Sequence, residues 1–144
     1  MKHKGALMEF SKERLDDLMR VYYEYIASCR HIRMDDVYKC IVNRPSKRFW
    51  VSDIRAALVV SAINRGEDCL KEMLPLKREM YMEIYRRVMN MKKKHPDMSV
   101  SELCSIVTMQ QAPKYYITPG SAKMMICKER KRWIGKKRKM MNLC

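Results

Sequence analysis

The two halves of the chain match each other when Lys12 is aligned with Arg78, and this internal match restricts the fold more than any other feature of the sequence. Conservative pairs run in order through both halves without a gap. The densest block sets residues 48–52, Arg-Phe-Trp-Val-Ser, over residues 114–118, Lys-Tyr-Tyr-Ile-Thr. Self-similarity at a fixed spacing is typical of a duplicated structural unit. The match therefore predicts two tandem repeats; because strict identities are few, chance agreement is the alternative.

Apolar residues in each half recur at steps of three and four, which is the spacing of one face of an α-helix. In the first half this stripe predicts a helix over residues 12–30. The matching helix of the second half is expected to end at Lys94, because Pro96 cannot continue it. A shorter helix follows in each half, over residues 35–42 and from the capping box that begins at Ser99.

The third helix of each repeat has a clear start signal. It begins at Ser52 in the first half and at Thr118 in the second, both good N-cap residues. Residues 54–63 are apolar almost all round, so the third helix is expected at the buried centre of its repeat. The predicted fold is all-α, with two tandem three-helix, helix-turn-helix-like repeats and a basic C-terminal tail. Its segments are a first repeat over 1–66, a connector over 67–76, a second repeat over 77–127 and a basic tail over 128–144.

Positive charge is concentrated near the C-terminus. The 144 residues carry a formal net charge of +15, and residues 128–139 contain eight Lys and Arg residues but one acidic residue. Such a block repels itself and is usually disordered until it meets a polyanion. Each cation that neutralises a phosphate releases counterions and adds sequence-independent affinity. Trp133 can stack on a base or insert at a lipid interface. The alternative is a tail that only solubilises or localises the protein.

The segments that join the second and third helices, residues 45–52 and 111–118, share a basic and aromatic pattern, and we call them the first and second corner. Side chains alternate along an extended chain, so Phe49 is expected to point inward and Arg48 and Trp50 outward, with the same alternation in the second corner. A cation beside a flat ring at the start of a helix favours phosphates and bases. The alternative is that both aromatic residues pack under a neighbouring helix.

The order of three helices, with the last one following a basic turn, resembles helix-turn-helix DNA-binding proteins. The whole chain resembles small basic proteins encoded by phages and mobile elements. Both resemblances rest on the repeated pattern at residues 48–52 and 114–118 and on the architecture. They imply binding to DNA. Because the corners are longer than the turn of that family and the third helices have few polar residues, phosphate-led binding fits better than base reading.

The sequence contains no pattern that predicts catalysis, a cofactor or a metal site. The three histidines are not placed beside a nucleophile, and the six cysteines include no Cys-x-x-Cys pair. Their apolar neighbours predict reduced core cysteines, with only Cys144 exposed. The acidic pairs at 16–17 and 35–36 are typical of helix caps or solvated faces. We therefore expect that the protein is not an enzyme.

The sequence also predicts a cytoplasmic protein without a membrane span. Its longest uncharged apolar run, residues 56–63, is far shorter than the roughly 20 residues that cross a bilayer. Charged residues follow the basic N-terminal segment too soon to leave the apolar region of a signal peptide.

Taken together, these patterns predict a non-catalytic nucleic-acid-binding protein, with DNA favoured over RNA, that contacts phosphates and bases through its corners and tail. The expected nucleic-acid-binding residues are Lys47, Arg48, Trp50, Arg55, Lys114, Tyr116, Lys123, Lys128, Arg130, Lys131, Arg132, Trp133, Lys136, Lys137, Arg138 and Lys139. The alternative is a phage or mobile-element structural or adaptor protein that binds another protein or a second copy of itself. A third hypothesis is attachment to a membrane surface through Trp133 and the lysines.

Overall fold

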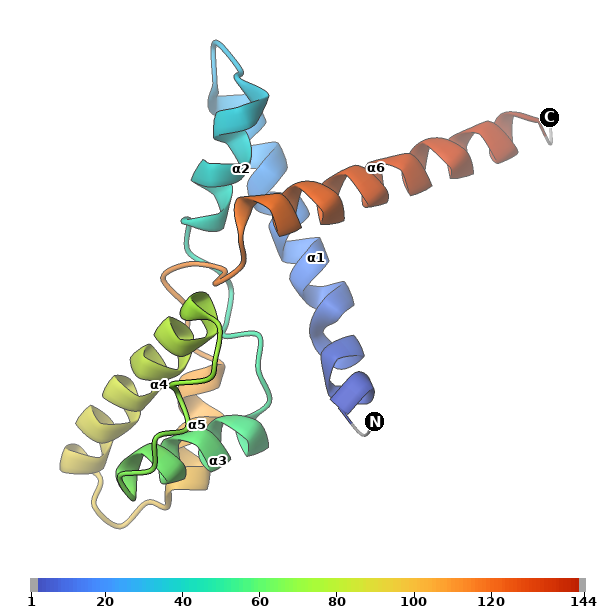
Figure 1. Cartoon of the computed structure of the whole chain (residues 1–144). Helices are drawn as coiled ribbons and strands as arrows, with labels where there is room; N and C mark the ends of the chain where they lie inside the picture. Colours follow the sequence, from blue (N-terminus) through green and yellow to red (C-terminus); the bar gives the residue numbers. More distant parts are fainter. Residues whose placement is uncertain (1–2, 143–144) are drawn as a thin grey trace.

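The computed structural model describes residues 3–142 of the chain, with side chains described for residues 10–141 (Figure 1). Over this range the chain forms six α-helices and no strand, which confirms the predicted all-α class. The helices are α1 (His3–Ser28), α2 (Met34–Val42), α3 (Asp53–Asn64), α4 (Pro75–Lys94), α5 (Val100–Thr108) and α6 (Pro119–Asn142).

Local sequence signals place most helix ends correctly. Ser52, Ser99 and Thr118 each accept a hydrogen bond from the amide N–H three residues later, at 3.1, 3.2 and 3.1 Å, as N-cap residues do. Gly66 follows α3 with a φ of 80°, a left-handed conformation that glycine adopts without strain. The first helix differs from the prediction, because α1 begins at His3 rather than near residue 12.

The six helices form two groups, and each group has its own hydrophobic core and combines both halves of the sequence. Helices α3, α4 and α5 enclose one core around Val60, Tyr81 and Leu103. Helices α1, α2 and α6 enclose the other around Leu18 and Ile126. Figure 1 shows α3, α4 and α5 as one group, with α6 leaving from beside α1 and α2. The third helix of each half therefore packs with the first two helices of the other half, and the cores do not follow the boundaries of segments 1–66 and 77–127.

The position of α3 corrects the prediction that it is the buried centre of its repeat. One face, with Ala56, Val59 and Val60, is buried against α4 and α5. The opposite face leaves Ile54 and Leu58 exposed to 72% and 66%. An apolar composition all round the helix therefore does not mean burial all round, because α3 covers one side of its core rather than filling it.

The exchange of third helices takes place where the two corners meet. Ser46 and Ala112, which the internal match aligns with each other, donate their amide N–H groups to each other's carbonyl oxygens at 2.9 and 3.0 Å. The N–H of Phe49 donates to the carbonyl oxygen of Thr108 at 3.0 Å. The aligned hydrogen bond, from Tyr115 to the carbonyl oxygen of Val42, has the same length. Each corner thus leads the chain from one core to the other.

The basic tail is helical, which corrects the expectation that residues 128–139 are disordered before they meet a polyanion. Helix α6 runs through this segment to Asn142 without interruption. Ala122 and Ile126 are fully buried against α1 and α2, so the first turns of α6 are held by packing. Once a helix is nucleated, lysine and arginine propagate it well.

Candidate nucleic-acid interface

Consecutive aromatic residues of each corner insert toward different cores. Phe49 is buried in the core of α3, α4 and α5, whereas Trp50 packs against the core of α1, α2 and α6. The second corner does the reverse, because Tyr115 is buried with α1, α2 and α6 and Tyr116 packs against the other core. The predicted alternation of side chains along each corner is present, but the side that was expected to face solvent faces the other core. Trp50 and Tyr116 are consequently half-buried rather than displayed to solvent.

The backbone of Tyr116 is also unusual. Its φ of 57° lies in the left-handed region, which is rare for an aromatic residue. The ring stacks on that of Phe49, with centroids 6.1 Å apart and planes inclined by 19°. Burial raises the pKa of its hydroxyl to about 12. These contacts make Tyr116 a packing residue at the junction of the corners.

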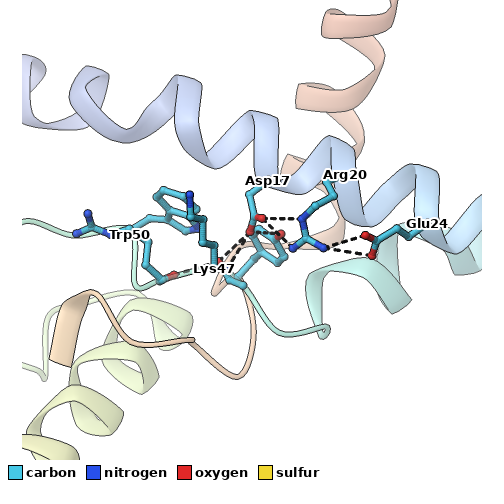
Figure 2. Close-up of polar contacts among 8 residues, drawn as sticks. Asp17, Arg20, Glu24, Lys47 and Trp50 are labelled. Atoms are coloured by element: carbon cyan, nitrogen blue, oxygen red, sulfur yellow. Dashed lines mark hydrogen bonds and ion pairs between the residues drawn. The ribbon is translucent and has the colours of Figure 1, made fainter. Parts of the chain in front are cut away.

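A buried carboxylate, Asp17 of α1, connects the two corners (Figure 2). Its Oδ2 atom accepts hydrogen bonds from the Tyr115 hydroxyl at 2.6 Å and from the Lys47 amide at 3.0 Å. Its Oδ1 atom accepts from Arg20, with a shortest distance of 2.8 Å. Trp50 belongs to the same cluster, since its indole N–H donates to the Ser46 hydroxyl at 2.6 Å.

The structure corrects the interpretation of the acidic pair at 16–17 for one of its two members. Asp16 is exposed, but Asp17 is only 7% exposed and is neither a cap nor a solvated residue. Burial acts to raise the pKa of Asp17, but hydrogen bonds from Tyr115, the Lys47 amide and Arg20 outweigh it and hold the pKa below its ordinary value. Asp17 lies on the helical face that also carries Leu18 and Val21, and this position could have predicted its burial from the sequence.

The cations of the corners do lie over aromatic rings, as the pattern predicts, but they also bind groups of the protein itself. The Arg48 guanidinium lies 4.5 Å from the ring centroid of Phe10 and 5.9 Å from that of Trp50. It donates to two carbonyl oxygens of its own corner, at 2.9 and 3.1 Å. Lys114 lies 5.5 Å from the ring of Tyr116 and forms an ion pair with Glu79. Arg48 and Lys114 therefore stabilise the corners.

The other predicted cations of the body, Lys47, Arg55 and Lys123, are exposed. Lys47 lies in the first corner, Arg55 is in the first turn of α3, and Lys123 is in the second turn of α6. They are distributed over both groups of helices, so the structure does not collect them into one site. The predicted residues that lie together are those of the C-terminal part of α6.

Residues 128–141 of α6, which we call the arm, carry all eight basic residues of the tail in exposed positions. Figure 1 shows α6 extending away from the other helices, and a helix of this length spans about 20 Å. Near its base, Arg130 lies 6.0 Å from the ring of Tyr22 and donates to its hydroxyl at 3.3 Å. Glu129, the acidic residue of the arm, is paired with Arg132 at 3.0 Å. The arm is therefore a projecting, strongly cationic helix.

The arm is also amphipathic, which the expectation of a disordered tail did not predict. Trp133, Ile134, Met140 and Met141 are 50% to 76% exposed, and their spacing places them on one face of the helix. Most of its cations lie on the remaining surface, and these are Lys128, Lys131, Arg132, Lys136, Arg138 and Lys139. A helix with one apolar and one basic face is suited to binding a polyanion and a second surface at the same time.

The cysteines are less buried than the sequence predicts. Cys104 lies in the core of α3, α4 and α5, but Cys40 is exposed, which contradicts the expectation that only Cys144 is exposed. Cys144 itself lies outside the described residues. Within residues 3–142, no three side chains of the metal-binding types come together. Over the same range, no helix combines the length and the apolar character that crossing a bilayer requires.

Comparison of the chain with protein-family models, with curated proteins and with solved structures gave no match. The function must therefore be inferred from the chain itself. The features that bear on it are the cationic arm, the body that holds the arm in place, and the clefts between the helices.

Proposed function

We propose that this protein is a non-catalytic nucleic-acid-binding protein, that DNA is its preferred partner, and that the arm makes the principal contact. The observation that carries the proposal is the arm itself, a projecting helix with eight exposed cations and one acidic residue that is already paired. An α-helix fits the major groove of B-form DNA, where cations on its flanks reach the phosphates of both strands. Counterion release then supplies most of the affinity.

The duplication predicted from the sequence is part of this proposal. Hydrogen bonds at aligned positions of the two halves support it, as does the Asp17–Arg20 ion pair, which the internal match aligns with the Glu83–Arg86 pair. A duplicated unit with exchanged third helices would be a stable base from which a single arm projects. Because the exposed face of α3 presents Ile54 and Leu58, base reading by a helix-turn-helix mechanism is not part of the proposal.

The corners have a supporting role in this proposal. Arg48 and Lys114 position the corners, while the exposed cations Lys47, Arg55 and Lys123 add phosphate contacts from the body. Phosphate contacts of this kind orient a protein on a duplex without selecting its sequence. We therefore expect high affinity with little sequence preference.

The test is the salt dependence of binding to duplex DNA, single-stranded DNA and RNA, with the full chain. The arm variant replaces four exposed cations by Gln at Lys136, Lys137, Arg138 and Lys139. The matched control replaces four exposed cations elsewhere by Gln at Arg33, Lys71, Lys93 and Lys94. The slope of log affinity against log salt should fall in magnitude by about 3 to 4 for the arm variant, since each phosphate contact contributes about 0.9. Equal losses in both variants, or binding that hardly changes with salt, would contradict the proposal.

The apolar face of the arm favours a second candidate function, that of an adaptor protein that binds another protein or a second copy of itself. Four large apolar side chains stand exposed on that face, and such patches mark interaction surfaces. Light scattering after nuclease treatment separates the two functions. Self-association that persists without nucleic acid, and that is lost in a Trp133→Ser, Met140→Ser variant, would favour the adaptor.

A further inference from the structure

A cleft lies between α1, the first corner and the N-terminal ends of α3 and α4. Its volume is about 170 Å³. Three cations line it, Arg14 from α1, Arg55 from α3 and Lys77 from α4, together with the aromatic side chains of Trp50 and Tyr81. Among the described residues that line the cleft, none is acidic. The cleft thus combines apolar walls with positive charge that has no counter-ion there.

One buried polar atom at this cleft, Nε of Arg14, has no hydrogen-bond partner among the described residues. The Tyr81 side chain is 0% exposed, and Arg55 lies beside its hydroxyl group. Buried polar groups are nearly always hydrogen-bonded, because leaving one unpaired costs its full desolvation free energy. An unpaired guanidinium donor at the wall of a cationic cleft indicates a ligand that accepts hydrogen bonds.

The charges around the cleft agree with this assignment. Burial lowers the pKa of Arg14, as happens when a guanidinium is desolvated without a carboxylate beside it. Burial raises the pKa of Tyr81, and a hydrogen bond with Arg55 offsets part of that rise, so Arg55 lies next to the Tyr81 hydroxyl at the cleft. A bound anion would compensate the positive charge of the cleft.

We propose that this cleft binds a phosphate monoester that is joined to an aromatic group, either directly or through a sugar as in a nucleotide unit. Three cations match the dianionic charge of a phosphate monoester better than the single charge of a carboxylate, and arginine pairs well with phosphate oxygens. The cleft has room for on the order of ten waters, which is more than a phosphate ion alone would fill. Trp50 and the partly buried Phe10, whose rings also lie near the Arg48 guanidinium, give the cleft apolar walls that an aromatic group can contact. This inference does not rest on the proposed function of the arm.

The test is isothermal titration calorimetry of the full chain with phenyl phosphate, adenosine monophosphate, adenosine and inorganic phosphate. The two organic phosphates should bind at least about tenfold more tightly than adenosine or inorganic phosphate, because only they use both parts of the cleft. Arg14→Met should weaken their binding by at least about tenfold, and Tyr81→Phe by less. Arg33→Met, which changes an exposed arginine of another surface, is the control and should bind normally.

The melting temperature of the ligand-free variants provides a second readout. Arg14→Met removes an unpaired buried group, so this variant should melt at the wild-type temperature or above it. A lower melting temperature of Arg14→Met would mean that the Arg14 guanidinium has a partner in the folded protein, which would overturn the inference. It would equally be overturned if neither organic phosphate bound, or if Arg14→Met and Arg33→Met bound them alike.

The phosphate could belong to a free nucleotide or to the 5′ end of a nucleic-acid strand, and an oligonucleotide experiment distinguishes these sources. The variant with Gln at the four arm positions is used, so that the arm contributes little. Tighter binding of a 5′-phosphorylated than of a 5′-hydroxyl strand would support the strand end as the ligand. Binding of adenosine monophosphate without such a preference would support the free nucleotide. In both cases, loss of nucleic-acid affinity in the arm variant reports on the proposed function, and nucleotide affinity reports on the cleft.

Discussion

The hydroxyl of Tyr115 donates a 2.6 Å hydrogen bond to Oδ2 of Asp17, a residue 98 positions earlier in the chain. The amide of Lys47 donates to the same oxygen at 3.0 Å. Since Tyr115 and Lys47 belong to different corners and Asp17 belongs to α1, one carboxylate oxygen connects three segments that are distant in sequence. This connection lies beside the exchanged hydrogen bonds of Ser46 and Ala112, so it stabilises the crossing of the corners.

Replacing Tyr115 by Phe should destabilise the protein without changing its fold. The substitution removes a hydrogen bond to a charged group, so the free energy of unfolding should fall by about 2 kcal/mol. Urea denaturation followed by circular dichroism measures it. Tyr23→Phe is the control, because Tyr23 is 56% exposed, and it should leave the unfolding midpoint unchanged. A midpoint that is equally unaffected in Tyr115→Phe would show that the hydrogen bond contributes nothing.

The low pKa of Asp17 predicts a specific loss of stability in acid. Because the folded-state pKa is held below that of the unfolded chain, this carboxylate stabilises the fold above about pH 4, where it is ionised in both states. The contribution is lost as the pH falls through the folded-state value. Thermal melts between pH 2 and 7 should show Asp17→Asn below the wild type at pH 7, with the two curves converging in acid. A constant difference at all pH values would contradict this role.

Hydrogen exchange can test the exchanged packing of the third helices. Ile126→Ala removes a fully buried side chain of α6 and should cost about 2 kcal/mol or more, with faster exchange in α1 and α2. Val60→Ala should instead speed exchange in α4 and α5, because Val60 of α3 packs with those helices. If Val60→Ala exposed α1 and α2 while leaving α4 and α5 protected, the exchanged arrangement would be wrong.

Cations of the corners and of the arm should respond differently to substitution. Lys114→Gln breaks a partly exposed ion pair and a contact with the Tyr116 ring, so it should lower the stability by up to about 1 kcal/mol and leave the salt slope of DNA binding unchanged. A Lys136→Gln, Lys137→Gln variant should lower the slope by about 2 and leave the stability unchanged. The opposite pattern would place the binding surface at the corners. Gel-shift titrations and urea denaturation supply the two measurements.

Thiol reactivity should separate Cys104 from Cys40. Burial raises the pKa of Cys104 to about 11, so its thiol is both inaccessible and protonated at neutral pH. Among the described cysteines Cys40 is the exposed one, so in a Cys144→Ser background it should react first with a disulfide reagent under native conditions. In a Cys40→Ser variant the fastest phase should disappear, while Cys104 should react at the rate of unfolding. Rapid labelling of Cys104 in the native protein would contradict its burial.

Features that depend on neighbouring residues in the chain were predictable. The caps at Ser52, Ser99 and Thr118 and the helical spacing of apolar residues are set within one or two turns, so pattern and propensity identify them. The cation beside a ring in each corner was also predicted, since it follows from the order of adjacent residues. What could not be predicted is which surface those rings face. Trp50 and Tyr116 were expected in solvent. Each of them instead lies against one core, while the aromatic residue just before it in the chain is buried in the other core.

The amino-acid sequence alone determined the helical class, the positions of the caps, and the excess of positive charge in the arm. Tertiary structure decided which helices share a core, because that choice is made by contacts between residues that are far apart in the sequence. The choice depends on the direction in which the corners leave their crossing, and that direction is held by contacts between distant residues, such as Ser46 with Ala112 and Asp17 with Tyr115. Packing at Ile126 likewise holds the start of the helix that continues into the arm. Charge repulsion within the arm alone would have predicted a disordered segment.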